Sequence, residues 1–248
     1  MRNRSFLCSC ATVVLVSMLL FMPQVRAEDD DRRDGHRPHV LSNAQVLAAT
    51  GQSIADWGAR WWQWAFEHPD VLGDTTGEFG PLGDVGGPVF FALGAGGDPV
   101  RASYKVPGDQ YILLPVATYI WTFFEPCAEI NCARSIVDHN AIGGITHVDV
   151  RIDGKRVSHM RAHLVKVGKH PLIFKVDAGP IQPDTGYGGI LDAVQGGYWL
   201  MLEPLSRGTH EISMLTTVPN LDPNTGEILD GFTDLDARLT LSVDRREK

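Results

Sequence analysis

The sequence predicts a mainly β protein: an antiparallel β-sandwich of jelly-roll or immunoglobulin-like type, with a tryptophan-rich helix packed on it near the N-terminus. Three observations lead to this prediction. Beyond residue 100, apolar residues alternate with polar ones at period two, which is typical of half-buried strands. Turn residues separate these short runs, and we expect no helical segments between them. Four of the six tryptophans fall between Trp57 and Trp64, with the spacing of a helix.

The first 27 residues are expected to be a signal peptide. Arg2 and Arg4 give a basic start, residues 12–22 form a short apolar run, and Val25-Arg26-Ala27 ends in the small-residue pattern that signal peptidase cleaves. The apolar run is far shorter than the roughly 20 residues that a spanning helix needs. We therefore expect a secreted or periplasmic protein with no transmembrane segment after cleavage.

Charge narrows the classes of partner. Cleavage after Ala27 would remove Arg2, Arg4 and Arg26 and no acidic residue, so the formal net charge would change from −8 to −11. An acidic chain is a poor partner for nucleic acid or an anionic membrane surface. Residues 28–40 are strongly charged and are expected to form a disordered leader. Residues 41–248 are then a single β-sandwich domain with N-terminal helices.

Two capping-box patterns predict two helices ahead of the strands. Ser42 and Gln45 open a helix that Gly51 closes, and Ser53 with Asp56 opens the tryptophan-rich helix, which ends at residues 68–69. In the second helix two adjacent apolar stripes cover more than half of the circumference, which predicts a helix buried on most sides. The stripes are Ile54, Trp57, Trp61 and Trp64, and Ala55, Ala59, Trp62 and Phe66.

Short apolar or alternating runs predict the strands in order. Residues 71–99 are rich in Gly, Pro and Asp and are expected to be loop around one buried strand. Asp222-Pro223-Asn224-Thr225-Gly226 predicts a tight turn before the last strand. The expected strands are 88–93, 111–116, 118–124, 146–152, 172–176, 198–202, 211–218 and 237–243.

Two cysteines remain after the predicted cleavage, Cys127 and Cys132. In an oxidising compartment, a pair five positions apart is expected to form a local disulfide. A redox motif would have C-x-x-C spacing instead.

One candidate site surrounds the turn at Asp153-Gly154. If Ile152 joins this turn to make a three-residue loop, His147 lies opposite His159 on one polar sheet face. A two-residue loop puts the two histidines on opposite faces, and their neighbours are then an ordinary solvated surface. The sequence leaves both registers open. Imidazoles with a carboxylate suit a zinc-like ion. The metal-ligand candidates are His147, Asp149, His159 and His163.

A second candidate site consists of aromatic residues late in the chain. Tyr187 lies in a Gly-Tyr-Gly-Gly loop, and Tyr198 and Trp199 follow in an expected strand. If exposed, these side chains would contact a sugar or a hydrophobic ligand. The alternative is that Tyr198 and Trp199 fill opposite faces of the strand, with one of them in the core.

Several blocks of the chain carry a resemblance. They are residues 60–64 (RWWQW), 74–77 (DTTG), the apolar strand before a double glycine at 88–97, Arg101 with Val106-Pro107, and residues 197–205 (GYWLMLEPL) with 208–212. Together they are similar to a family of secreted, mostly bacterial proteins that has no established function. The resemblance covers most of residues 55–215. It implies export and a shared fold that includes the tryptophan helix, and it implies no activity, cofactor or catalytic residue.

The same resemblance implies a difference in cysteines. Members often have a cysteine pair flanking the first strand, whereas this chain has Gly80 and Tyr104 in those neighbourhoods. The corresponding bridge is therefore not expected here.

Two classes of function follow from the sequence. The first is a non-catalytic binding or structural module of the cell envelope with no cofactor, whose partner is a small molecule, a glycan or an envelope protein. The second is a metal-dependent extracytoplasmic hydrolase that uses the His/Asp set. No G-x-S-x-G or papain-like cysteine pattern is present to suggest a covalent hydrolase.

Overall fold

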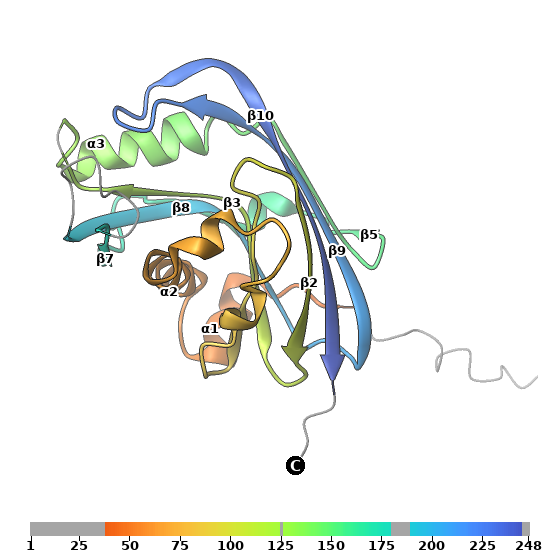
Figure 1. Ribbon diagram of the computed structural model, residues 1–248. Helices are drawn as coiled ribbons and strands as arrows, with labels where there is room; N and C mark the ends of the chain where they lie inside the picture. The colour runs from red at the N-terminus through yellow and green to blue at the C-terminus, as the bar shows by residue number, and fades with distance from the viewer. Residues whose placement is uncertain (1–37, 125, 180–188, 245–248) are drawn as a thin grey trace, which may run out of the picture. The chain divides into compact units, whose positions relative to one another are not determined.

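Two five-stranded sheets carry the part of the chain that the computed structural model describes, residues 38–124, 126–179 and 189–244 (Figure 1). These residues belong to one compact unit that runs from His36 to Lys248. The chain is mainly β, as the alternating pattern predicts. The predicted signal peptide and most of the predicted leader lie outside the described residues.

The first sheet, sheet A, has the strand order β1-β3-β8-β6, with β7 also pairing with β8. Its pairs are antiparallel except that β1 runs parallel to β3. The strands are β1 (Val89–Phe91), β3 (Tyr111–Thr122), β6 (Leu164–Val165), β7 (Phe174–Asp177) and β8 (Ile190–Leu202).

The second sheet, sheet B, has the order β2-β10-β9-β4-β5, and here β2 runs parallel to β10. Both sheets are therefore mixed, and the prediction of a purely antiparallel fold is wrong. A period-two pattern shows that a strand is half-buried but carries no information on the direction of its neighbour. The strands are β2 (Val100–Pro107), β4 (His147–Ile152), β5 (Lys155–Arg156), β9 (Gly208–Leu221) and β10 (Ile228–Asp244).

Two α-helices precede the strands, α1 (Asn43–Thr50) and α2 (Ile54–Glu67). Both begin at a complete capping box, Ser42 with Gln45 and Ser53 with Asp56, and Gly51 ends α1 in the left-handed conformation. Pro69 begins a short 3₁₀ turn, Pro69–Gly73, that ends α2. A second 3₁₀ turn covers Gly80–Gly83.

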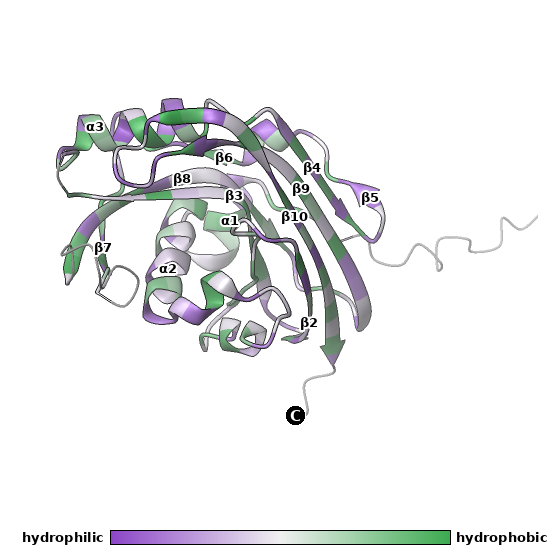
Figure 2. Ribbon diagram, turned by 45° about the horizontal axis from the view of Figure 1, so that its top comes forward, coloured by the Kyte–Doolittle hydropathy of each residue, from purple (hydrophilic) through white to green (hydrophobic). Residues whose placement is uncertain are grey.

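Apolar side chains pack in two main layers. Between the sheets, residues of β1, β3 and β8 pack against residues of β2, β4, β9 and β10. Figure 2 shows the hydrophobic bands of sheet B. On the other face of sheet A, α2 packs Trp57, Trp61 and Trp64 against Phe91 and Trp199. Gln195 joins helix and sheet, because it accepts a hydrogen bond from Trp199 Nε1 (2.8 Å) and donates one to the carbonyl of Ala55 (3.1 Å).

A helical segment lies where the sequence pattern predicts none. Ile130–Arg134 forms α3, Ser135–Ala141 continues it as a π-helix, and Met160–His163 is a 3₁₀ turn. The first two elements are packed between β3 and the β9–β10 hairpin, as Figure 1 shows. The expectation of no helices among the strands is wrong because this amphipathic segment is short and β-branched residues interrupt its helical pattern.

The predicted disulfide is present at the start of this segment. Cys127 and Cys132 are bonded, with Cα atoms 5.5 Å apart. Among the described residues, no helix combines the length and the hydrophobicity needed to cross a bilayer.

Candidate functional site

An apolar cleft opens at the edge of sheet A where β3 loses its neighbour. β1 pairs with β3 only from Tyr111 to Leu113. Beyond that point α2, the loop 94–97 and the β9–β10 hairpin enclose a cleft of about 750 Å³. Its lining residues are Trp61, Trp62, Val71, Leu72, Gly94, Ala95, Gly96, Gly97, Pro115, Val116, Thr118, Tyr119, Val218, Pro219, Asn220, Leu221, Leu229, Thr233 and Leu235.

Helix α2 supplies two adjacent tryptophans with different roles. Trp61 is 4% exposed, and its Nε1 donates to the carbonyl of Ala92 at 2.9 Å, which fixes the ring. Trp62 is half-buried and packs edge-on against Trp61, with ring centroids 5.0 Å apart. Its Nε1 is buried and has no hydrogen-bond partner. Trp61 therefore anchors the helix, whereas Trp62 lines the cleft and has one buried donor without a partner.

Strand β3 contributes a second polar atom without a partner. The pairing with β8 shifts by one residue between Pro115 and Ala117, so β3 has a bulge at this point. A bulge changes the direction in which the following side chains project. Tyr119 follows it and lines the cleft, and its hydroxyl is buried without a partner. Burial raises the pKa of the Tyr119 phenol to about 12, so the hydroxyl keeps its proton at neutral pH.

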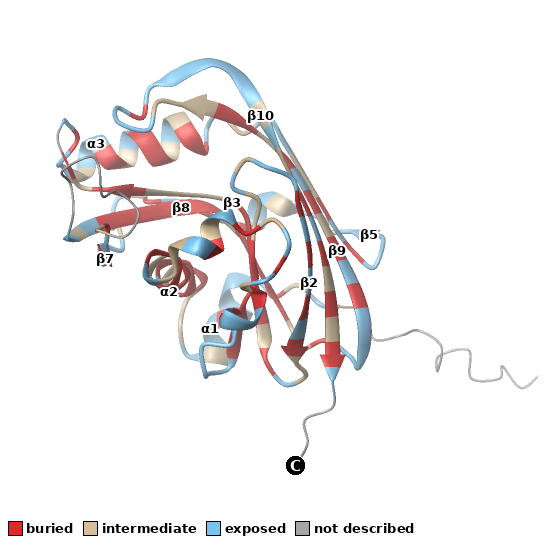
Figure 3. Ribbon diagram, in the orientation of Figure 1, coloured by how far each residue is buried: buried red, intermediate tan, exposed pale blue. Residues whose placement is uncertain are grey.

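The β9–β10 hairpin forms the opposite wall and the rim. Asn220 on β9 accepts a hydrogen bond from Thr233 Oγ1 on β10 at 2.6 Å, which makes one polar point on an otherwise apolar wall. Toward its tip the hairpin exposes Ile228, Leu229 and Phe232. Figure 3 shows this part of the hairpin as an exposed arch beyond sheet B.

The glycine-rich loop after β1 closes the remaining side. A Cβ atom at Gly94 would lie 2.6 Å from the backbone oxygen of Pro115, so only glycine lets the loop approach β3 this closely. The loop is therefore a wall of the apolar cleft.

A smaller hollow of about 260 Å³ adjoins the cleft. Tyr119 and Leu221 line both hollows. Ile136, Val137 and Ala141 of the π-helix line the smaller one. π-Helical turns occur frequently at functional sites. An elongated ligand would pass Tyr119 to reach from one hollow into the other.

The cleft suits binding better than acid–base chemistry. Among the described residues that line the larger hollow, Tyr119 is the only one with a titratable side chain. General acid–base catalysis needs a group whose pKa lies near the working pH. A phenol with a pKa of about 12 does not meet that requirement.

The described aromatic residues that were predicted to contact a ligand, Tyr198 and Trp199, do not form an exposed surface site. Trp199 is fully buried under α2, with its ring centroid 5.7 Å from that of Trp61. Tyr198 is half-buried and packs against the core between the sheets. The two therefore occupy opposite faces of β8, and Trp199 belongs to the core. Tyr187 lies outside the described residues.

The hairpin at Asp153-Gly154 adopts the two-residue register. Ile152 pairs with Lys155 and Arg151 with Arg156, and both turn residues have positive φ, 50° at Asp153 and 74° at Gly154. The three-residue loop is therefore wrong. β5 ends at Arg156, so His159 is not paired with His147 in a sheet.

As a result of this register, the four metal-ligand candidates do not lie together. His159 and His163 line one hollow of about 510 Å³, which His147 and Asp149 do not line. Burial lowers the pKa of His163, so this ring is neutral at physiological pH. In the part of the chain that the structure describes, no three His, Cys, Asp or Glu side chains lie close enough together to hold a metal ion.

Asp149 has other partners. Arg156 Nε lies 2.6 Å and Arg151 Nε 3.2 Å from its carboxylate oxygens. Burial raises the pKa of Asp149, but the hydrogen bonds and positive charges of Arg151 and Arg156 outweigh this effect and lower it. A metal ion at Asp149 would have to displace two guanidinium groups.

A Ser/His/Asp arrangement that the sequence pattern does not reveal lies near the β8–β9 loop. His210 Nδ1 is 2.8 Å from Asp153 Oδ2, and His210 Nε2 is 3.3 Å from Ser206 Oγ. However, Nε2 lies closer, at 2.9 Å, to the backbone oxygen of Ser206. A catalytic base needs a free lone pair on Nε2 that faces the nucleophile. With an acceptor on each side, this ring instead ties the loop to the β4–β5 turn.

Sequence reasoning missed the cleft residues, of which Trp62 and Tyr119 are the most informative. They lie 57 positions apart; Trp62 belongs to the RWWQW block, which indicates no function, and Tyr119 belongs to none of the blocks described above. The weak signal available was the width of the apolar surface of α2, which exceeds what a single sheet face covers. Comparisons of the chain with protein-family models, with curated proteins and with solved structures gave no match.

Proposed function

We propose that this protein is an exported, non-catalytic binding module whose cleft between α2, β3 and the β9–β10 hairpin takes an apolar small molecule. One observation carries the proposal: two residues that line an apolar cleft of about 750 Å³, Trp62 and Tyr119, each have a buried polar atom without a partner, Nε1 and Oη respectively. Ligand sites in proteins are commonly 300–1,000 Å³ and combine apolar walls with a few placed polar groups.

The two polar atoms define the ligand chemistry. An unpaired buried donor costs about 1–3 kcal/mol, and a bound acceptor would recover part of that cost. Trp62 can only donate, and the protonated Tyr119 hydroxyl donates as well. The ligand class is therefore an apolar molecule with a carbonyl or ether oxygen. The larger hollow has no charged lining residue among those described, which disfavours an ionic ligand.

The fold that we propose is a β-sandwich, with sheets A and B as its layers and the tryptophan-rich α2 on the outer face of sheet A. Export to the periplasm or outside the cell is part of the same proposal. Its support is the signal-peptide pattern of residues 1–27 together with the Cys127–Cys132 disulfide, which suits an oxidising compartment.

Membership in the family of secreted bacterial proteins also remains a proposal, and one contact supports it. Gly80 and Tyr104, which stand where members often have a cysteine pair, touch each other: a Cβ at Gly80 would lie 3.1 Å from the Tyr104 Cβ. Two positions that carry a disulfide must be close neighbours, with Cβ atoms about 3.5–4.5 Å apart, so these two segments would have to separate slightly to hold one.

The test compares two uncharged probes of the same shape, a naphthyl ketone and the corresponding naphthyl alkane, by calorimetry on the purified protein. We expect both to bind and the ketone to bind about five- to tenfold more tightly, because one buried hydrogen bond contributes about 1 kcal/mol or slightly more. In a Trp62→Phe/Tyr119→Phe variant this preference should disappear while the alkane still binds.

Ile190→Ala is the matched control, because Ile190 is 70% exposed and does not line the cleft. Its binding should equal that of the wild type. If Ile190→Ala weakens both probes as much as Trp62→Ala does, the probes are adsorbing to exposed apolar surface and the proposal is wrong.

A further inference from the structure

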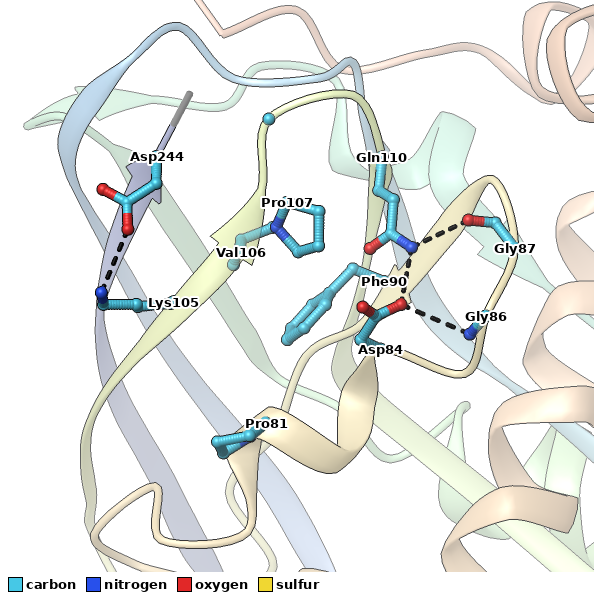
Figure 4. Close-up of a pocket in the computed structure, with 11 residues that line it drawn as sticks. Pro81, Asp84, Gly86, Gly87, Phe90, Lys105, Val106, Pro107, Gln110 and Asp244 are labelled. Carbon is cyan, nitrogen blue, oxygen red and sulfur yellow. Dashed lines mark hydrogen bonds and ion pairs between the residues drawn. The ribbon is translucent and has the colours of Figure 1, made fainter. Parts of the chain in front are cut away.

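A second pocket, separate from the apolar cleft, has an orphaned acceptor in its wall. It measures about 820 Å³ and lies among the loop before β1, the end of β2 and the end of β10 (Figure 4). Gln110, which lines it, is only 6% exposed. Its Oε1 is buried without a hydrogen-bond partner.

The orientation of the Gln110 amide is fixed by its own donors. Nε2 donates to Asp84 Oδ1 and to the backbone oxygen of Gly87, both at 2.8 Å. Exchange of the amide N and O would place an acceptor against these two acceptors, so the orientation is determined by the network. Figure 4 shows the consequence: Oε1 points into the pocket, between Pro107 and Phe90.

Asp84 adds a second acceptor on the same side. Its Oδ1 receives the bonds from Gln110 Nε2 and from the backbone N–H of Gly86. The other carboxylate oxygen points into the pocket (Figure 4). Lys105 and Asp244 stand on the far rim, paired at 3.1 Å and both largely exposed. The charged lining residues are thus two carboxylates and one ammonium group.

These features select among ligand classes. An oxygen-rich site for Ca²⁺ needs six to eight oxygen ligands, and only two acceptors converge here. A sugar would favour an exposed aromatic face for stacking, but Phe90 is fully buried. A primary ammonium ion has three donors and no acceptor, which matches Gln110 Oε1 and the Asp84 carboxylate. Pro81, Val106 and Pro107 provide aliphatic wall for an alkyl stem.

We propose that this pocket binds a primary alkylammonium group, with Gln110 Oε1 and Asp84 as its hydrogen-bond acceptors. The site is independent of the apolar cleft, because the residues described as lining the two have no member in common.

The test uses n-pentylammonium chloride and 1-pentanol, which have the same shape and differ in charge, with amide shifts of the full chain recorded by NMR. We expect the amine to shift the Gly86 and Gly87 signals and the Gln110 side-chain amide, while the alcohol at the same concentration shifts none of them. Equal shifts from the alcohol, or complete displacement of the amine by equimolar Ca²⁺, would overturn the proposal.

Asp84→Asn is the informative variant, because Asn Oδ1 can still accept from Gly86 and Gln110 while the charge is lost. We expect the amine to bind at least roughly fivefold more weakly, as charge-assisted hydrogen bonds are about twice as strong as neutral ones. Asp98→Asn is the matched control, because Asp98 is exposed and does not line the pocket, and it makes the same change in net charge. An equal loss in both variants contradicts the site, whereas retained amine binding in Trp62→Phe/Tyr119→Phe shows that it is independent of the cleft.

Discussion

Asp74 shows how one residue of a short motif organises a loop. It is 7% exposed, and its carboxylate accepts hydrogen bonds from the backbone N–H groups of Thr76, Gly77 and Phe79 at 2.8–2.9 Å. Gly77 adopts a positive φ of 87° inside this loop. The D-x-T-G block that contributes to the family resemblance is therefore a structural loop, in which Asp supplies the acceptors and Gly the left-handed backbone.

The Asp74 carboxylate should make stability depend on pH. Burial raises its pKa, but the backbone hydrogen bonds from Thr76, Phe79 and Gly77 outweigh burial and lower it. A lowered folded-state pKa stabilises the protein above the ordinary Asp value of about 3.9, and this contribution is lost as the pH falls through the folded-state value. We expect Asp74→Asn to lose about 2 kcal/mol of unfolding free energy at pH 7, with a smaller loss below pH 4.

Urea unfolding of both proteins between pH 7 and pH 3 measures this difference. The exposed Asp98→Asn serves as control and should stay within about 0.5 kcal/mol of the wild type. A deficit in Asp74→Asn that is the same at every pH would show that the carboxylate charge has no role in the loop.

At the scale of the element, one side of α2 packs against sheet A and an adjacent side lines the cleft. Trp57, Trp61 and Trp64 are nearly fully buried against sheet A, whereas Trp62 is half-buried and faces the cleft. The two apolar stripes in the sequence predict extensive burial, and the structure distinguishes them. Every residue of the first stripe is buried, although Trp61 also borders the cleft, and the second stripe contains the half-buried Trp62. Density of tryptophan alone does not reveal this division of roles.

Replacement of two neighbouring tryptophans should therefore give different results. Trp61→Ala should lose about 3–5 kcal/mol of unfolding free energy, because it removes a packed indole and leaves the carbonyl of Ala92 without its donor. Trp62→Ala should lose less than about 2 kcal/mol, since its side chain is only partly buried and its Nε1 has no partner to lose. Chemical denaturation followed by far-ultraviolet circular dichroism measures both, and equal losses would remove the distinction.

At the scale of the whole molecule, local sequence patterns predicted where helices and strands lie better than they predicted which strands pair with each other. Capping residues located α1 and α2, and alternation located β4 and β9 to within three residues, whereas the predicted start of the last strand at residue 237 lies nine residues after the start of β10. The alternation Val100, Ala102, Tyr104 and Val106 is equally regular in β2, yet the expected strands omit it because Gly- and Pro-rich loop precedes it. The parallel pairing of β2 with β10 depends on the chain crossing between sheets, which no local pattern encodes.

The cleft was unpredictable for a related reason. Trp62, Tyr119 and Asn220 come from three distant segments that meet only because β1 is three residues long and leaves the edge of β3 uncovered. The metal hypothesis depended on register instead. Positive φ values at both Asp153 and Gly154 favour the two-residue turn, and this choice separates His147 from His159.

The segment between α2 and β1 contacts sheet B where Gly80 packs against Tyr104 of β2. A Gly80→Cys/Tyr104→Cys variant should form a disulfide after the two segments move apart by a few tenths of an ångström, because a Cβ at position 80 would lie 3.1 Å from the Cβ of residue 104 and a disulfide needs about 3.5–4.5 Å. We expect its oxidised form to be about 3 kcal/mol more stable than its reduced form. Peptide mass mapping identifies the bond, and wild type with and without reductant corrects for Cys127–Cys132. Free thiols at both positions under oxidising conditions would contradict the geometry.

The pairing of β2 with β10 has a consequence for the order of events during synthesis. Arg101 of β2 pairs with Asp236 of β10, 135 positions further along the chain. Strand β10, which lies between β2 and β9 in sheet B, is thus the last of the described strands to be made, and β2 and β9 each lack a neighbour until it arrives. Pairing across such distances is slow because the loop must close first. If the chain is exported in an extended form, as our proposal of an exported protein implies, it gains time from this arrangement, since sheet B cannot close before β10 has been translated.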